Sequence, residues 1–147
     1  AAAELTKAKE GRLDCVVMDY LQLLGVGKGE REYDVFTDAS KRAKQMAKDL
    51  GCFVVLLCQL NRELERRQDK RPILADLRAT GQLEQDADVV LFPFRPCEYD
   101  DSIAETEAEC HVAKQRGGRK GRVPLVWQGE HTRFRNVDAL GLEAVAK

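Results

Sequence analysis

Two polar side chains stand where they could bind a nucleoside triphosphate. Asp19 directly follows the apolar residues 15–18, and Gln59 directly follows the apolar residues 53–58. A carboxylate at the end of a buried strand can hold Mg²⁺ through water beside a triphosphate, but it can equally cap the next turn. An amide in the same place can bond a γ-phosphate or its attacking water, or it can satisfy the backbone of its own loop. The spacing by itself leaves each pair of alternatives open.

A second stretch is strongly basic. Its cationic side chains surround three glycines between residues 117 and 121, and they are Lys114, Arg116, Arg119, Lys120 and Arg122. A basic turn of this kind binds phosphate weakly and without specificity, or it is simply solvated. The glycine-rich residues 25–29 suggest a phosphate cradle only superficially. They lack the spacing of the phosphate-binding loop motif, and they do not lead from a strand directly into a helix.

Other titratable residues favour a structural interpretation. Neither His111 nor His131 has the spacing of a nucleophile or a metal ligand, so we expect both at the surface. The carboxylates Glu84, Asp86 and Asp88 are explained by capping and solvation. The cysteines are Cys15, Cys52, Cys58, Cys97 and Cys110. Their odd number and the absence of a C-x-x-C pair predict reduced, small core residues of a cytosolic protein rather than a zinc site.

The elements that must position Asp19 and Gln59 form a strand–helix–strand pattern. Residues 15–18 and 53–58 are short apolar runs without alternation, which predicts strands buried on both faces of a parallel sheet. Between them, Asp34 or Asp38 can cap a helix that runs to Leu50 and ends at Gly51. Its predicted inner face consists of Ala39, Ala43, Met46, Ala47 and Leu50. A βαβ unit places both strand ends at one sheet edge, where α/β proteins bind ligands.

The remaining elements follow from the pattern on either side. Residues 1–10 favour a helix that stops at Gly11. Residues 89–92 predict a third core strand, which Pro93 and Pro96 end. Apolar residues then alternate with polar or mixed positions over residues 107–112 and 123–127, which indicates an antiparallel hairpin with a glycine-rich tip. Residues 132–137 add a last strand, and the tail after Asp138 is expected to be helical or frayed.

Length and composition limit the possible domain number, location and mode of nucleic-acid binding. The chain has 147 residues and a formal net charge of −1. We expect a single domain over residues 1–147, and any nucleic-acid contact must come from local basic patches. No apolar run approaches the roughly 20 residues of a membrane span, and no signal peptide is present, so a cytoplasmic location is expected. The chain begins with Ala1 rather than Met, so we expect that it starts inside a larger natural sequence.

Four linked phrases carry a family resemblance. QLNRELERR, DKRP, DLRATG and LEQDADVV resemble the third conserved motif of the DnaB-type hexameric replicative DNA helicases. CVVMDYLQLL is similar to the family's Walker B strand, AKQRGG to its basic hairpin and GEHTRF to its closing strand, so the resemblance covers residues 13–135. It implies an α/β fold: an incomplete RecA-like P-loop NTPase core, mostly parallel sheet, with a carboxyl-terminal antiparallel hairpin. By the same resemblance, the phosphate-binding loop, the catalytic Glu of an earlier strand, the amino-terminal domain and the linker helix are expected to be missing from this chain.

The resemblance implies roles for individual residues. Asp19 would hold Mg²⁺ through water, and Gln59 would sense the γ-phosphate of ATP. Lys114 and Arg116 would reach the triphosphate of the neighbouring subunit, with Arg116 as the arginine finger. The roles implied at the DNA are those of Arg78 on phosphate, of the backbone at Gly81, and of Arg119 and Lys120 as further contacts. Ala79 and Thr80 depart from the family's usual Glu and Ser, which puts the finer DNA contacts in doubt.

The function implied is ATP-driven unwinding of duplex DNA at a replication fork by a ring-shaped homo-hexamer. ATP and Mg²⁺ are its cofactors, and single-stranded DNA, primase and a helicase loader are its expected partners. By itself, this chain is expected to be inactive. One alternative is a non-catalytic DNA-binding or ring-interacting module. Another is a RecA-like recombinase or a clock-type relative, which the series DKRP, DLRATG and LEQDAD argues against.

Overall fold

The computed structural model describes residues 2–77 and 81–137. Two compact units divide the chain. The first unit comprises Ala1–Asn61 and Leu77–Ala87, and the second comprises Arg62–Asp76 and Asp88–Lys147. The expectation of a single domain stays a prediction, and each unit is described by itself.

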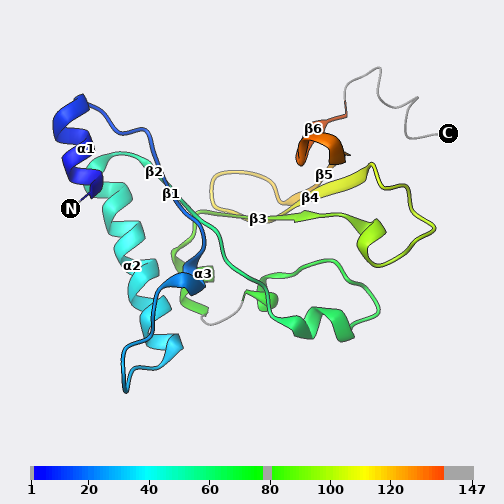
Figure 1. Ribbon diagram of the computed structural model, residues 1–147, viewed down its shortest axis with the longest axis horizontal. Helices are drawn as coiled ribbons and strands as arrows, with labels where there is room; N and C mark the ends of the chain where they lie inside the picture. The colour runs from blue at the N-terminus through cyan, green and yellow to red at the C-terminus, as the bar shows by residue number, and fades with distance from the viewer. Residues whose placement is uncertain (1, 78–80, 138–147) are drawn as a thin grey trace. The chain divides into compact units, whose positions relative to one another are not determined.

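A parallel pair of strands is the centre of the first unit. β1 (Cys15–Met18) and β2 (Phe53–Leu56) pair in register from Cys15 opposite Phe53 to Met18 opposite Leu56. The long helix α2 (Glu32–Leu50) connects them and lies alongside the pair in Figure 1. The predicted strand–helix–strand pattern is therefore confirmed. Helix α1 (Ala2–Glu10) precedes it and ends at Gly11, whose φ of 74° is left-handed, as predicted.

The apolar strands of the first unit are not buried on both faces, and this part of the prediction is wrong. Val17 is 62% exposed and Phe53 is 78% exposed, whereas the alternate residues of each strand are half-buried. Leu56 from the covered face contacts a core of Leu21, Phe36 and Leu83. Within the described residues, this core and α2 cover one face of the pair and leave the other open.

Helix α2 ends at Leu50, as predicted, but it begins earlier than predicted, at Glu32. Its inner face is the predicted one, because Ala43 is buried and the other predicted positions are half-buried. Gly51 ends it in the left-handed conformation, with φ 62°. The predicted caps are wrong: Arg31 occupies the N-cap position and makes no side-chain cap bond. Asp34 lies inside the first turn and pairs with Arg31 instead, so its charge still complements the helix dipole.

The second unit contains an antiparallel sheet of four strands in the order β3-β4-β5-β6. The strands are β3 (Val89–Phe94), β4 (Glu107–Gln115), β5 (Gly121–Gln128) and β6 (Arg133–Asn136). The predicted hairpin and last strand are confirmed. The tail after Asp138 lies outside the described residues.

Strand β3 differs from its prediction in two ways. It pairs antiparallel with β4, and its burial alternates, so it is not a strand of a parallel sheet covered on both faces. The described residues therefore do not form a mostly parallel sheet: two strands are parallel and four are antiparallel. Pro93 also lies inside β3 rather than ending it. Because β3 is an edge strand of this sheet, the missing N–H of Pro93 costs little.

A register shift between Val90 and Leu91 changes the faces of β4. Val90 lies opposite Lys114, but Leu91 lies opposite Val112, so Ala113 is an extra residue of β4. Side chains directly opposite each other share a face of a sheet. Lys114 therefore shares the face of His111 and Glu109, which lie opposite Phe92 and Phe94. A regular strand would place Lys114 on the other face.

Three short 3₁₀ helices and one α-helix complete the segments discussed below. They are η2 (Arg62–Arg66), η3 (Leu74–Asp76), η4 (Pro96–Glu98) and α3 (Gly81–Asp86). No helix in the described part of the chain is long and apolar enough to cross a membrane.

Phe36→Ala should strongly destabilise the first unit. Its ring is 1% exposed, and removing it leaves a cavity beside Leu21 and Leu83 that should lower the free energy of unfolding by about 3–5 kcal/mol. Tyr33→Ala on the same helix is the control, because Tyr33 is 53% exposed, and it should change stability by less than about 0.5 kcal/mol. Urea unfolding followed by circular dichroism measures both. Equal losses would contradict the described core.

Candidate functional site: the β1–β2 edge and the basic hairpin

Asp19 and Gln59 lie at the same end of the parallel pair, as their positions predict. Backbone bonds extend the pairing past both strands, from Leu57 N to Met18 O at 3.0 Å and from Leu21 N to Leu57 O at 2.9 Å. Both polar side chains are exposed at this end. Among the residues that the structure describes, none forms a hydrogen bond or ion pair with either side chain. Both are therefore available to a ligand.

Gln22 positions this edge, and the sequence reasoning missed it. Its Oε1 accepts the backbone N–H of Gln59 at 3.1 Å, and its Nε2 lies 3.3 Å from the Gln59 carbonyl oxygen and 3.2 Å from Cys58 Sγ. The amide of Gln22, rather than that of Gln59, thus satisfies the loop backbone. A signal was present in the sequence, because Gln22 is a lone polar residue between apolar neighbours in a segment that leaves a strand.

The glycine-rich residues 25–29 do not form an anion cradle. Glu30 Oε2 accepts the backbone N–H of Gly27 at 2.9 Å. A carboxylate already occupies the position in which a phosphate would need that donor, and its negative charge repels an anion. This geometry agrees with the sequence argument against a phosphate-binding loop.

The predicted DNA loop is described only at its two ends. Arg78 lies outside the described residues, and Gly81 is the exposed first residue of α3. At the other end, Asp76 is buried and accepts a bond from Arg67 Nη2 at 2.6 Å and another from the Ile73 N–H at 2.8 Å. Asp76 thus anchors the start of the loop in the second unit.

The two candidate residues for the neighbouring triphosphate lie at the end of β4. Lys114 is half-buried, and Arg116 is exposed. The Arg116 N–H donates to the Asp88 carbonyl oxygen at 2.9 Å, and Arg116 Nη1 lies 3.4 Å from Asp88 Oδ1. This pair fixes the backbone of Arg116 while its side chain faces solvent.

The carboxylates before β3 do more than cap and face water. Asp88 pairs with Arg116, and Asp86 accepts bonds from Ser40 Oγ and from Gln82 Nε2, each at 2.8 Å. The prediction of capping and solvation is therefore wrong for Asp86, whereas the exposed side chain of Asp88 agrees with solvation. Because Ser40 is buried in α2, its bond to Asp86 ties α3 to α2 inside the first unit.

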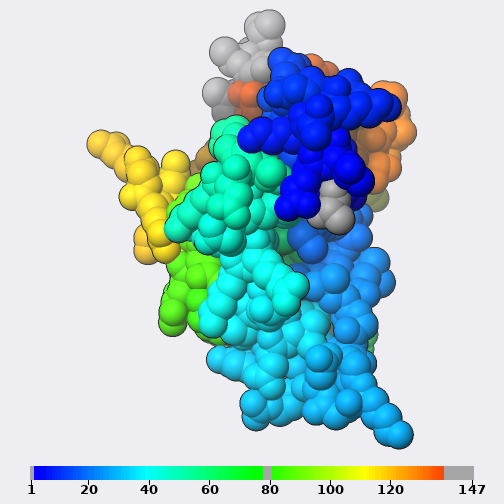
Figure 2. All heavy atoms as spheres, turned by 90° about the vertical axis from the view of Figure 1, so that its left-hand side faces the viewer, coloured from blue at the N-terminus to red at the C-terminus, as the bar shows by residue number. Residues whose placement is uncertain are grey.

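The hairpin tip carries the remaining basic residues. Arg119 and Lys120 are exposed, and the tip extends as a narrow projection beyond its strands, drawn in yellow in Figure 2. Arg122 lies opposite His111 on β5 and also faces solvent. The charge of Arg122 contributes to lowering the pKa of Asp69, although the hydrogen bond from the Arg71 N–H is the largest cause.

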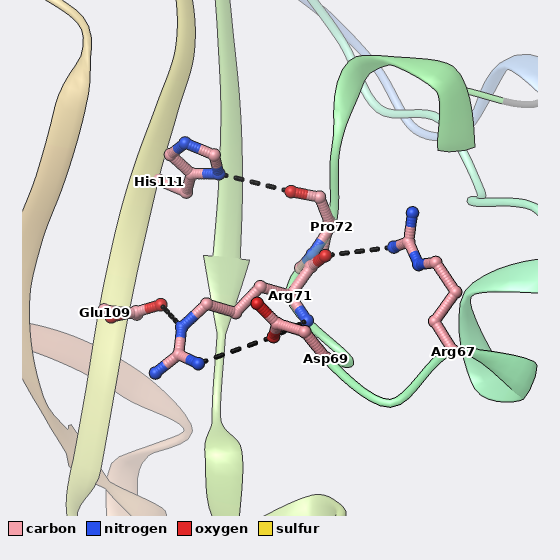
Figure 3. A network of polar contacts seen from close by, with 6 residues as sticks. All are labelled: Arg67, Asp69, Arg71, Pro72, Glu109 and His111. Carbon is pink, nitrogen blue, oxygen red and sulfur yellow. Dashed lines mark hydrogen bonds and ion pairs between the residues drawn. The ribbon is translucent and has the colours of Figure 1, made fainter.

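A polar network covers one face of the second sheet (Figure 3). Arg71 Nε donates to Glu109 Oε1 at 2.8 Å, and His111 Nδ1 lies 3.2 Å from the Pro72 carbonyl oxygen. His111 is therefore half-buried against a loop, and the prediction of a surface position is wrong for it. His131 is exposed, as predicted.

The five cysteines are free thiols, as predicted, but none is fully buried. Cys15 is exposed, so the prediction of a core position is wrong for it, whereas half-buried Cys58 packs against the core of Leu21, Phe36 and Leu83. Burial raises the pKa of the Cys58 thiol, and the hydrogen bond from Gln22 opposes this in part. Burial also raises the pKa of Cys110.

Comparisons with known proteins give one consistent relationship. Residues 1–136 match the family model of the DnaB-like helicase C terminal domain. The chain is 40% identical over 134 residues to the replicative DNA helicase DnaB of Geobacillus stearothermophilus, covering 88% of this chain and 29% of that protein. It is 41% identical over 132 residues to DnaB of Haemophilus influenzae, covering 88% of this chain and 28% of that protein. The chain thus spans less than a third of the length of these curated relatives.

Solved structures agree with the sequence relatives. A DnaB-like replicative helicase, solved in a study of its interactions with primase, superposes with a TM-score of 0.86 at 41% identity, covering 93% of this chain and 34% of that chain. A second match is an ATPase domain, with a TM-score of 0.83 at 37% identity, covering 92% of this chain and 49% of that chain.

The alkylation rate of Cys58, the residue before Gln59, tests the described burial of its thiol. Because the thiolate is the reactive form and burial raises the pKa of Cys58, iodoacetamide at pH 8 should modify Cys58 several-fold more slowly than exposed Cys15. The difference between the two modification rates should become smaller as the pH rises toward the pKa of Cys58. Mass spectrometry of timed digests measures both rates, with the urea-unfolded chain as the control in which they converge. Equal rates in the folded chain would contradict the described burial.

Proposed function

We propose that this chain, which belongs to the DnaB-like helicase C-terminal domain family, forms the ATP-sensing and DNA-contacting part of a replicative helicase that unwinds duplex DNA as a ring-shaped homo-hexamer. The relatives that it resembles at about 40% identity are replicative DNA helicases. One structural observation carries the proposal. Asp19 and Gln59 are exposed together at the carboxyl end of a parallel strand pair, which is where α/β folds bind ligands.

Asp19 would hold Mg²⁺ through water at this edge. Mg²⁺ is usually bound by one or two carboxylates together with substrate phosphates, and it keeps several of its waters. The residues present fit this mode of binding, because Asp19 offers one exposed carboxylate at the edge. When bound, Mg²⁺ neutralises the charge that develops on the β- and γ-phosphates.

Gln59 would orient the γ-phosphate or the attacking water. The Gln22 amide bonds both the backbone N–H and the carbonyl oxygen of Gln59. The side-chain amide of Gln59 is therefore not needed to satisfy the backbone of its own loop. A fixed backbone with an exposed amide suits a sensor, because loss of the γ-phosphate then changes the partner of one side chain.

Arg116 would act as an arginine finger, with Lys114 beside it. The Arg116–Asp88 pair is more than half exposed on both sides, and such pairs contribute only about 0–1 kcal/mol. Arg116 can therefore exchange Asp88 for a phosphate of the neighbouring subunit at little cost. The bulge at Ala113 supports a joint role, because it turns Lys114 to the face of His111 and Glu109.

The DNA contacts would come from Arg78, from the backbone at Gly81, and from Arg119 and Lys120 at the tip. The projecting basic tip supports the last two assignments. In the hexamer, the other parts of the ATP site come from outside this chain, so the chain by itself should be inactive. A primase and a helicase loader are the proposed protein partners. The primase has support from the similar helicase that was solved in a study of its interactions with primase.

Arg116→Ala should nearly abolish ATP turnover in the complete ring protein that carries this chain. Loss of an arginine finger lowers turnover by about 10³–10⁵-fold, and ATP binding by the altered subunit should survive because the finger acts on its neighbour. Phosphate release and fluorescent-nucleotide binding measure the two effects. Arg135→Ala, on the exposed strand β6, is the matched control and should hydrolyse ATP normally. Hydrolysis near the wild-type rate in Arg116→Ala would exclude the finger.

Arg78→Ala should weaken the binding of single-stranded DNA and reduce its salt dependence. Each phosphate contact contributes roughly 0.7 to the log–log salt slope on single strands, so the slope should flatten by about that amount. Fluorescence anisotropy with an oligo-dT probe at several NaCl concentrations measures it. Arg66→Ala is the control, because Arg66 is exposed and forms its ion pair with nearby Glu63. An unchanged slope in Arg78→Ala would exclude this DNA contact.

A further inference from the structure

The segment before the DNA loop is fixed to the second sheet by polar contacts. We call Arg62–Asp76, which precedes Arg78, the arm. Arg71 Nε donates to Glu109 Oε1 at 2.8 Å, and its guanidinium carbon lies 5.7 Å from the centre of the Phe94 ring. His111 Nδ1 lies 3.2 Å from the Pro72 carbonyl oxygen (Figure 3). Adjacent residues of the arm thus contact two residues of β4.

These polar contacts position a part of the arm that has little apolar surface to bury. Most of residues 62–71 are charged or amide residues, and Leu64 is their one buried apolar side chain. Pro72, which directly follows, is also buried. The side chain of Glu109 is 18% exposed and that of Arg71 is 36% exposed. A partly buried, hydrogen-bonded pair is stronger and more directional than an ion pair in water.

Hydrogen bonds within the arm connect its contact with β4 to the start of the proposed DNA loop. Arg67 Nη2 donates to the Arg71 carbonyl oxygen at 3.0 Å and also to Asp76 Oδ2 at 2.6 Å. Asp76 in turn accepts the N–H of Ile73. The guanidinium of Arg67 therefore links Arg71, which contacts β4, to buried Asp76, which lies two positions before Arg78 in the sequence.

The other side of the contact leads to the finger residues. Glu109 and His111 belong to β4, and the extra residue Ala113 brings Lys114 to the same face of the sheet. Arg116 follows two residues later, with its backbone fixed on Asp88. The arm therefore contacts β4 at Glu109, and Arg116 directly follows the last residue of the same strand.

We propose that Arg71, Glu109 and His111 form a positioning clamp, which couples DNA binding at the loop after the arm to the placement of Lys114 and Arg116. This inference rests on the proposed function. DNA that pulls on the loop shifts the arm, and the clamp transmits the shift to β4. The clamp residues contact neither substrate nor DNA in this scheme, and they act only through the loop and the finger.

The test separates ATP hydrolysis in the absence of DNA from its stimulation by DNA. Glu109→Gln keeps the shape of the side chain and removes its charge. In the complete ring protein, the ratio of hydrolysis with saturating oligo-dT to hydrolysis without it should fall about five-fold or more. Hydrolysis without DNA and the affinity for oligo-dT should both stay within about two-fold of wild type, which a merely structural role would not predict. Asp34→Asn, which breaks the exposed Arg31–Asp34 pair on α2, is the matched control and should leave the ratio unchanged.

A double-variant cycle tests whether the contact itself carries the effect. Arg71→Gln should lower the same ratio, and combining it with Glu109→Gln should lower the ratio no further than the worse single variant. His111→Phe, which removes the bond to Pro72, provides an independent variant and should act in the same direction. Additive losses, an unchanged ratio, or parallel losses with and without DNA would overturn the clamp.

The outcome for the wild-type protein separates this inference from the function on which it rests. ATP hydrolysis that DNA stimulates in the wild type, and equally in all clamp variants, would overturn the clamp and leave the proposed function intact. A wild-type ring protein whose hydrolysis DNA does not stimulate would overturn the clamp, and one that neither hydrolyses ATP nor unwinds duplex DNA would overturn the proposed function as well.

Discussion

The apolar contact of Leu21, Phe36 and Leu83 is the interaction on which the first unit depends. Each residue comes from a different part of the chain: Leu21 lies two positions after Asp19, Phe36 belongs to α2, and Leu83 belongs to α3. Burying Leu21 completely fixes the direction in which the chain leaves β1. That direction places Gln22 against the backbone of Gln59, so a small apolar core determines where the polar groups of the edge lie.

In the second unit, polar contacts contribute more than apolar packing to holding the arm on the sheet. Its sheet buries alternate residues of β3, and the charged arm lies on the sheet through guanidinium, carboxylate and imidazole groups. Such contacts are directional, and each has only one or two good geometries. They therefore define position more narrowly than apolar packing of the same area, but they have to be made as a set, because a partner left alone in a half-buried place is costly.

Much of this architecture could be predicted from the sequence, because it depends on local periodicity. The apolar run, the 3.6-residue pattern and the left-handed glycine that define β1, α2 and Gly51 are readable within a few residues. Topology then places Asp19 and Gln59 at one edge. The antiparallel pairing of β3 could not be read in this way, because a short apolar run looks the same in either kind of sheet. The bulge at Ala113 and the contacts of Gln22, His111 and Asp88 depend on residues far away in the sequence, which a local pattern cannot indicate.

The open apolar face of β1 and β2 gives the chain a characteristic response to its solvent. Val17, Phe53 and Val55 place hydrocarbon surface in contact with water, where the free-energy cost depends on salt and temperature. Sulfate and other excluded solutes raise that cost and favour any state that covers the face, whereas cooling and low concentrations of urea lower it. The solution behaviour of the chain should therefore follow the Hofmeister order of the added salt more closely than its ionic strength.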